Sequence, residues 1–257
     1  MLKLKMSTRG QFNPTQRFSS RVADYVKYRP GYPPQVVRWL SERCGLTPAS
    51  VIADVGSGTG LLTKLFLDNG NPVYGVEPNA EMRLAGEHFL AAYPNFISTN
   101  GTAENTTLPA ASVDFVAAGQ AFHWFDGAKA GAEFRRILKP GGWVALIWND
   151  RDTASTPFLR EYERMLQTYS TDYRAVDHKN TDVNTLGILL ERKDFANAQV
   201  FDFAALKGRL MSSSYAPQEG HPQHEPMLKE LRRMFDTHNQ NGAVEFKYTT
   251  QVFVGQA

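Results

Sequence analysis

Apolar and polar positions alternate with two different periods through the middle of the chain. Short apolar runs rich in β-branched residues, typical of buried strands, lie at residues 51–55, 72–77, 95–99, 113–118 and 142–148. Segments with apolar residues three or four positions apart, typical of helices, lie near residues 59–69, 79–92 and 127–138. A strand followed by a helix, repeated along the chain, predicts an α/β domain with a mainly parallel sheet.

This alternation stops after residue 150. Apolar residues from Phe158 to Tyr169 have helical spacing, and a polar stretch follows them through Asn184. An insertion after the carboxyl end of a strand either covers the ligand crevice as a lid or adds a packing helix.

The C-terminal part returns to strand-like patterning. Residues 198–206 and 243–254 alternate apolar and polar positions, and a helical pattern near 224–238 separates them. Strands joined in this way can pair in an antiparallel manner and complete the sheet. The N-terminal part is polar through residue 20, where we expect no fixed structure, and then helical. We therefore divide the chain into an N-terminal cap segment 1–45, a ligand-binding core 46–150, a helical lid insertion 151–197 and C-terminal strands 198–257.

Composition and charge narrow the class of protein. The 257 residues carry a formal net charge of +2, too small and too scattered a basic excess for a nucleic-acid-binding face. The single cysteine, Cys44, excludes an intramolecular disulfide, and no apolar run approaches the roughly 20 residues that span a bilayer. His221 and His224 have no cysteine or carboxylate at metal-ligand spacing beside them, so we expect no metal. We expect a cytoplasmic monomer or weak homodimer without nucleic-acid or membrane partners.

The most informative segment is the strand and glycine loop from Asp54 to Gly60, which reads Asp-Val-Gly-Ser-Gly-Thr-Gly. Glycines after a strand let backbone N–H groups approach a ligand with no Cβ in the way. A phosphate-binding P-loop would need a lysine, which the loop lacks. A dinucleotide fingerprint would need its third glycine at position 61, where the chain has Leu61.

The spacing Asp-x-Gly-x-Gly-x-Gly resembles class I S-adenosylmethionine-dependent methyltransferases. The order of the later motifs adds to the resemblance: Glu77-Pro78 after the second strand, Ala103-Glu104 after the third, Asp114 on the fourth and Lys139-Pro140-Gly141-Gly142 before the fifth. The chain is similar to the methyltransferase type-11 group. Segments 28–33 and 120–125 resemble its trans-aconitate methyltransferase-like subgroup.

The resemblance implies a fold, a cofactor and a reaction. The fold would be a Rossmann-like, doubly wound, seven-stranded sheet, mostly parallel with an antiparallel C-terminal strand, plus a small helical cap. The cofactor would be S-adenosylmethionine, and the acceptor a small molecule methylated on a carboxylate or hydroxyl. Two alternatives stay open, a nicotinamide-dependent oxidoreductase and a cofactor-binding module without turnover.

Candidate cofactor contacts follow the strand ends. A carboxylate at Glu77 can accept hydrogen bonds from both ribose hydroxyls. By the resemblance, Ala103 and Glu104 flank the adenine, and Gln120 either binds the methionine end of the cofactor or packs within its loop. The complete candidate set is Asp54, Gly56, Ser57, Gly58, Gly60, Glu77, Pro78, Ala103, Glu104 and Gln120.

Candidate acceptor contacts lie in two other segments. His123 is the candidate catalytic residue, because an imidazole titrates near neutral pH; it is either a base or a structural histidine. Trp124 is expected to form a wall of the pocket. Tyr28, Arg29 and Tyr32 belong to a segment expected to fold back over the cofactor, where Arg29 either holds an anionic substrate or pairs with a carboxylate of the fold.

Overall fold

The computed structural model describes residues 27–171, 173 and 181–257. Its centre is a seven-stranded sheet with the strand order β3-β2-β1-β4-β5-β7-β6, in which β7 is antiparallel to both of its neighbours. This confirms the predicted Rossmann-like sheet with an antiparallel C-terminal strand. The strands are β1 Ile52–Val55, β2 Val73–Val76, β3 Phe96–Thr99, β4 Val113–Gly119, β5 Leu138–Arg151, β6 Glu191–Phe201 and β7 Val244–Gln256.

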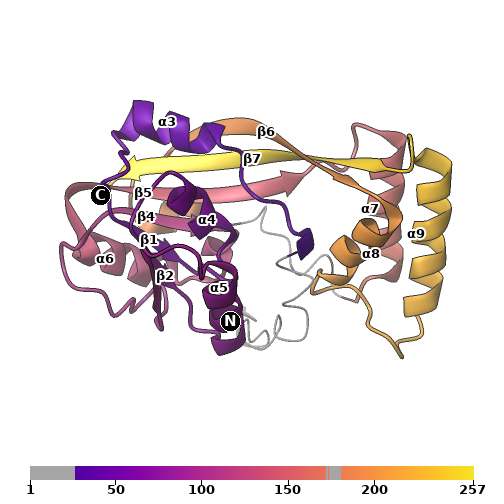
Figure 1. The fold of residues 1–257 in the computed structure, drawn as a ribbon, viewed down its shortest axis with the longest axis horizontal. Helices are drawn as coiled ribbons and strands as arrows, with labels where there is room; N and C mark the ends of the chain where they lie inside the picture. The colour runs from indigo at the N-terminus through magenta and orange to yellow at the C-terminus, as the bar shows by residue number, and fades with distance from the viewer. Residues whose placement is uncertain (1–26, 172, 174–180) are drawn as a thin grey trace, which may run out of the picture.

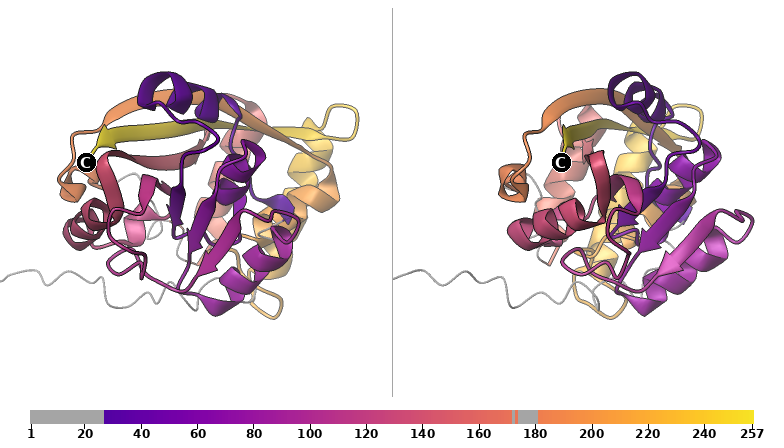
Figure 2. Two further views of the ribbon diagram at one scale, coloured as in Figure 1. Left: turned by 60° about the vertical axis from the view of Figure 1, so that its left-hand side comes forward. Right: turned by 90° about the vertical axis from the view of Figure 1, so that its left-hand side faces the viewer.

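Helices cover both faces of the parallel part of the sheet. They are α3 Gln35–Cys44, α4 Leu61–Asp68, α5 Ala80–Phe89 and α6 Gly127–Ile137, with short 3-10 turns η2 Phe122–Trp124 and η5 Val183–Leu186. Ile52 of β1 packs in a cluster with α3 and α4, whereas the next residue, Ala53, packs in a second cluster with α6. Successive strand residues point to opposite faces, so this division shows a doubly wound sheet. Figure 2 shows α3 and α6 on opposite sides of it.

Three further helices form a separate helical layer: α7 Pro157–Tyr169, α8 Phe203–Met211 and α9 His224–His238. They share a hydrophobic cluster with residues at the start of β7, such as Phe246 and Tyr248. Strand β5 pairs with β4 only as far as Ile147, opposite Gly119, but it pairs with β7 as far as Arg151. The long strands β5, β6 and β7 therefore connect the parallel part of the sheet to the helical layer (Figure 1).

The structure corrects two boundaries in the C-terminal part. Residues 203–206, expected in a strand, lie in α8, because Asp202 caps this helix by accepting a hydrogen bond from the backbone N–H of Ala205 at 2.7 Å. Residues 191–197, assigned to the insertion, form the first part of β6. The C-terminal 60 or so residues therefore supply two helices as well as strands, and α9 lies where the sequence predicted a helix.

Local residue types account for two of the helix ends. Asn79 caps α5 by accepting hydrogen bonds from the backbone N–H groups of Glu81 and Met82, and Gly45 ends α3 in the left-handed conformation. Residues 1–26 of the predicted cap segment, including the part expected without fixed structure, lie outside the described residues. Within the described ranges, the structure contains no helix with the length and apolar character needed to cross a membrane.

Candidate functional site

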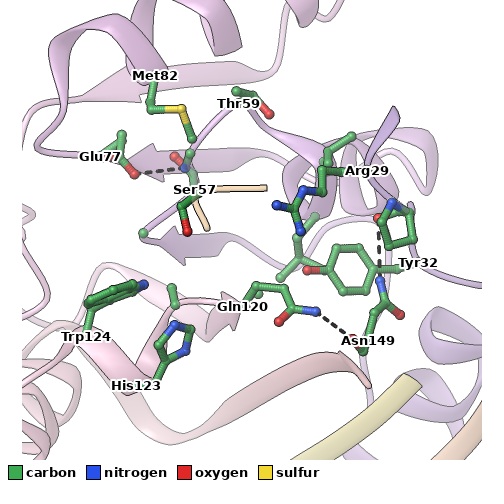
Figure 3. A pocket seen from close by; sticks show the side chains of 18 of the residues that line it. Arg29, Tyr32, Ser57, Thr59, Glu77, Met82, Gln120, His123, Trp124 and Asn149 are labelled. Carbon is green, nitrogen blue, oxygen red and sulfur yellow. Dashed lines mark hydrogen bonds between the residues drawn. The ribbon is translucent and has the colours of Figure 1, made fainter. Parts of the chain in front are cut away.

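A cavity of about 670 Å³ lies between the carboxyl ends of β1, β2 and β4 and the helical layer. Small-molecule sites commonly have volumes of roughly 300–1,000 Å³. Most of the predicted site residues line this cavity, as Figure 3 shows for several of them: Arg29, Tyr32, Asp54, Gly56, Ser57, Gly58, Glu77, Pro78, Ala103, Glu104, Gln120, His123 and Trp124. Gly60 and Tyr28, which were also predicted, do not line it.

The glycine loop has a backbone that side chains other than glycine rarely adopt. Gly56, Gly58 and Gly60 have φ values of +70°, +57° and +87°. A Cβ added to Gly56 would lie 2.7 Å from the Cβ of Ala121, so this glycine also permits close packing on the loop after β4. Gly60 is the residue before α4, and a Cβ there would lie 2.6 Å from a methyl group of Leu90. Gly60 therefore allows the loop to pack against Leu90, and it does not line the cavity.

Glu77 connects the end of β2 to the glycine loop. Its Oε2 accepts a hydrogen bond from the backbone N–H of Gly58 at 2.9 Å, and its Oε1 accepts one from Asn79 at 2.8 Å. Burial raises the pKa of Glu77, and these two hydrogen bonds oppose the rise. Each carboxylate oxygen can accept a further hydrogen bond, so the side chain still suits the two hydroxyls of a ribose.

Asp54 carries a buried polar atom without a partner. Its Oδ2 accepts a hydrogen bond from the Thr63 hydroxyl at 2.6 Å, but its Oδ1 has no hydrogen bond to any described residue. Burial raises the pKa of Asp54 to about 7. A buried acceptor at the edge of a cavity is suited to a ligand that brings a donor or a positive charge. The ammonium group of S-adenosylmethionine has both properties, so Asp54 fits this cofactor.

The segment after β3 is tied to the start of α6. Ala103 is buried, and Glu104 accepts a hydrogen bond at its Oε1 from the backbone N–H of Asp126 at 2.9 Å. Asp126 in turn caps α6. Both Ala103 and Glu104 line the cavity, so the structure brings the residues predicted beside the adenine to the same space as the glycine loop.

The loop after β4 carries Gln120, His123 and Trp124. Gln120 has φ +56°, and its amide Nε2 donates to the backbone carbonyl of Asn149 on β5 at 3.1 Å. This hydrogen bond connects the loop to β5, and Gln120 still lines the cavity. The rings of His123 and Trp124 lie 4.8 Å apart, and Figure 3 shows them across the cavity from Arg29 and Tyr32.

The segment before α3 folds against the cavity from the other side. Arg29 donates from Nη2 to the carbonyl of Ser212 at 3.0 Å, and Asn149 donates to the carbonyl of Gly31 at 3.1 Å. Tyr28, predicted to bind substrate, instead covers Gly208 of α8 with its ring, at a point where a Cβ would clash. Tyr28 therefore packs this segment against the helical layer, and it does not line the cavity.

Sequence reasoning missed the part of the cavity that faces the helical layer. Side chains from β5, α7, α8, the segment after α8 and β7 line it, namely Arg151, Glu163, Arg209, Tyr215 and Tyr248. The available signal was Arg209, a basic residue at helical spacing from the apolar residue Leu206 of α8. Among the described residues, no group of three or more histidine, cysteine, aspartate or glutamate side chains is placed to hold a metal ion.

The central part of the chain matches a known domain. Residues 53–146 match the family model for the methyltransferase domain. An uncharacterized methyltransferase of Schizosaccharomyces pombe is 36% identical over 151 residues, covering 58% of this chain and 59% of that protein. One from Mycobacterium tuberculosis is 41% identical over 137 residues, covering 52% and 53%. The chain thus spans little more than half the length of these curated relatives.

Solved structures extend the likeness beyond the matched domain. A protein of Anaeromyxobacter dehalogenans described as a candidate type II methyltransferase superposes with a TM-score of 0.69 at 24% identity, covering 89% of this chain and 98% of that one. Phosphoethanolamine N-methyltransferase 2 of Haemonchus contortus, solved with phosphomonomethylethanolamine and S-adenosylhomocysteine, superposes at 0.52 with 14% identity, covering 98% and 60%. At such identities the likeness shows the fold, which is the Rossmann-like fold of methyltransferases.

Proposed function

We propose that the protein is an S-adenosylmethionine-dependent methyltransferase that acts on a small-molecule acceptor. The observation that carries the proposal is the hydrogen bond between Glu77 and the glycine loop at Gly58, on the wall of a cavity of ligand size. This arrangement lies within the residues that match the methyltransferase domain. A nicotinamide-dependent oxidoreductase gains no support from the loop, because Leu61 stands where its third glycine is needed.

Four groups would hold the cofactor. Glu77 would accept hydrogen bonds from the ribose hydroxyls, and the unpartnered Oδ1 of Asp54 would accept one from the ammonium group. Ala103 and Glu104 would flank the adenine. When bound, S-adenosylmethionine supplies a methyl group already activated by a sulfonium, so the protein has mainly to position the acceptor and exclude water.

The acceptor would lie between the loop after β4 and the helical layer. A carboxylate acceptor needs no base, whereas a hydroxyl acceptor must lose its proton. His123 lines the cavity and would take that proton or orient the acceptor, with Trp124 as a wall beside it. Membership of the trans-aconitate methyltransferase-like subgroup would favour the carboxylate, and it rests on segments 28–33 and 120–125 alone.

Calorimetry with S-adenosylhomocysteine tests the cofactor. We expect saturable binding to the wild-type protein and none of NADH, which a parallel fluorescence titration measures. A panel of small carboxylic and phenolic acceptors, analysed by mass spectrometry for a gain of one methyl group, then tests turnover. Failure to bind S-adenosylhomocysteine overturns the proposal. Binding without methylation of any acceptor in a wide panel supports the module without turnover.

A further inference from the structure

The end of the cavity that faces the helical layer is rich in guanidinium groups. Arg29 comes from the segment before α3, Arg151 from the last position of β5, and Arg209 from α8, and all three line the cavity. They are far apart in the sequence and are brought together by the fold. Figure 3 shows the guanidinium group of Arg29 directed into the cavity.

Arg209 is a buried cation with neutral neighbours. It is 5% exposed, its Nε lies 3.4 Å from the hydroxyl of Tyr248, and its Nη1 donates to the hydroxyl of Ser213 at 3.1 Å. No carboxylate in the described part of the chain forms an ion pair with it, and its Nη2 makes no hydrogen bond there. A buried charge without a counter-ion is costly, so this position is suited to a bound anion.

Arg151 also has a guanidinium N–H donor that no described residue accepts. Its Nη2 donates to Glu163 at 2.5 Å and to the hydroxyl of Tyr173 at 3.0 Å. Its Nη1 is buried and has no hydrogen-bond partner among residues 27–171, 173 and 181–257. The guanidinium lies 5.1 Å from the ring centroid of Tyr162, which holds it in place. One side of Arg151 is thus neutralised by the protein and the other side is left for a ligand.

Tyr215 lies within electrostatic reach of all three arginines. Burial alone would raise the pKa of Tyr215, but the guanidinium groups of Arg209, Arg29 and Arg151 lower it. Tyr215 also lines the cavity. The positive potential of all three arginines therefore acts on one small region.

Two acidic side chains of the described ranges, Glu163 and Asp150, lie at this end of the cavity. Glu163 is engaged by Arg151, and although burial opposes the change, hydrogen bonds from Tyr173 and Arg151 lower its pKa. Asp150 also lines the cavity, but it forms no ion pair with Arg209 and instead interacts with Arg192 on β6. Glu163 therefore does not balance the charge of Arg209, and among the described residues no other carboxylate forms an ion pair with it.

We propose that Arg209, Arg151 and Tyr215 form an oxyanion-binding subsite that takes a carboxylate or phosphate group of the acceptor. The carboxylate or phosphate bound there is separate from the acceptor atom that receives the methyl group. Guanidinium groups recognise both carboxylate and phosphate through paired N–H donors. The assignment to the acceptor rests on the proposed function, whereas anion binding at this position does not.

The experiment measures binding of two anions by calorimetry at constant ionic strength. Sodium phosphate and sodium malonate are the probes, and malonamide is the uncharged counterpart of malonate. Each is titrated into the protein alone and into the protein saturated with S-adenosylhomocysteine. We expect at least one anion to bind in both states and malonamide to bind in neither. Comparison of phosphate with malonate shows which chemical group the subsite prefers.

Two variants assign the binding to these residues. Arg209→Met removes the buried charge and should lower the affinity for the preferred anion about tenfold or more, since a hydrogen bond to a charged group is lost. The same variant should keep or raise the unfolding temperature of the free protein, because an unbalanced buried charge is removed. Arg151→Met is the second variant, in which Glu163 keeps its hydrogen bonds from Tyr173 and Gln167.

Arg232→Met is the control, because Arg232 is exposed, pairs with Asp236 on the surface of α9, and does not line the cavity. It should bind the anions as the wild type does. Equal anion binding by wild type and either folded cavity variant overturns the proposal, as does binding of malonamide with the affinity of malonate. If S-adenosylhomocysteine abolishes anion binding, the subsite holds the carboxylate of the cofactor and the assignment to the acceptor is wrong. Failure of the protein to bind S-adenosylhomocysteine, with anion binding intact, contradicts only the proposed function.

Discussion

Glu77 at the end of β2 accepts a hydrogen bond from the backbone N–H of Gly58, in the loop after β1, at 2.9 Å. One side chain therefore fixes the position of the glycine loop and also presents its remaining lone pairs to the cavity. The two roles can be separated by substitution, because an amide keeps one acceptor oxygen and loses the other.

Glu77→Gln should weaken binding of S-adenosylhomocysteine by about 10–100-fold. The amide retains one acceptor oxygen, but it replaces the other with a donor that faces a backbone N–H group, and a hydrogen bond to a charged acceptor is worth about 1.5–3 kcal/mol. Calorimetry measures the change. Glu81→Gln, on the exposed side of α5, is the matched control and should leave affinity unchanged. Wild-type affinity in Glu77→Gln would contradict the assignment of this residue.

Gly56→Ala should lose most binding of S-adenosylhomocysteine and lower the unfolding temperature. The new Cβ would meet the Cβ of Ala121 at 2.7 Å, in a backbone with φ +70°. Gly220→Ala is the control, since Gly220 has φ +86° but nothing within 4 Å of the added Cβ. The control carries the backbone strain alone, about 1 kcal/mol, and should bind normally. Equal effects of the two substitutions would mean that contact with Ala121 is unimportant.

Asp54→Asn should remove a pH dependence of stability. Burial raises the pKa of Asp54 to about 7, so between its unfolded value near 3.8 and pH 7 the folded protein holds a proton that the unfolded chain has lost. The stabilising contribution is complete below the unfolded pKa and is lost as pH rises through 7. Asparagine does not titrate, and its carbonyl oxygen can still accept the hydrogen bond from Thr63.

As the pH rises from 5 to 8, the wild type should therefore lose about 2–3 kcal/mol more free energy of unfolding than Asp54→Asn does. Urea unfolding at the two pH values measures this difference. Asp236→Asn, at an exposed position on α9, is the control and should follow the wild type closely. If the free energy of unfolding of Asp54→Asn changed with pH as that of the wild type does, this carboxyl group would not be held in its neutral form.

His123→Asn should discriminate between classes of acceptor. If the imidazole removes a proton, the rate with a hydroxyl acceptor should fall about 10²–10⁴-fold, whereas a carboxylate acceptor should lose far less. Affinity for S-adenosylhomocysteine should be kept. Rates for paired phenolic and carboxylic acceptors, measured from pH 6 to 9, provide the comparison, with His88→Asn at the end of α5 as the control. Equal losses with both acceptor classes would favour a structural histidine.

Local patterns in the sequence predicted the parallel half of the fold and the cofactor end of the cavity. Strands β1 and β2 are short and almost wholly buried, and the residues Gly56 and Glu77 follow them directly in the chain. The geometry therefore depends on neighbours in sequence, and period and spacing suffice to find it. Asp202 carried an equally local signal for the start of α8, but the alternation of Val200, Phe201 and Phe203 concealed it.

The other end of the cavity depends on contacts between residues distant in sequence. Arg151 faces Tyr248 through the register of β5 and β7, and Arg209 reaches the hydroxyl of the same tyrosine from α8. No spacing within a single segment encodes such a meeting point. The position of Tyr28 could not be predicted for the same reason, since only the packing of its ring on Gly208 shows which surface it covers.

The length of β5 has a consequence for the size of the acceptor. Ile147 lies opposite Gly119, where the loop that carries His123 begins, and Arg151 lies four residues further along the same strand. At about 3.3 Å per residue, these positions are roughly 13 Å apart along a rigid, paired strand. We therefore expect acceptors in which the charged group and the methylated atom lie at a separation that this distance along β5 can accommodate. An insertion of two residues in this part of β5 would select longer molecules, whereas an insertion of one would turn Arg151 to the opposite face.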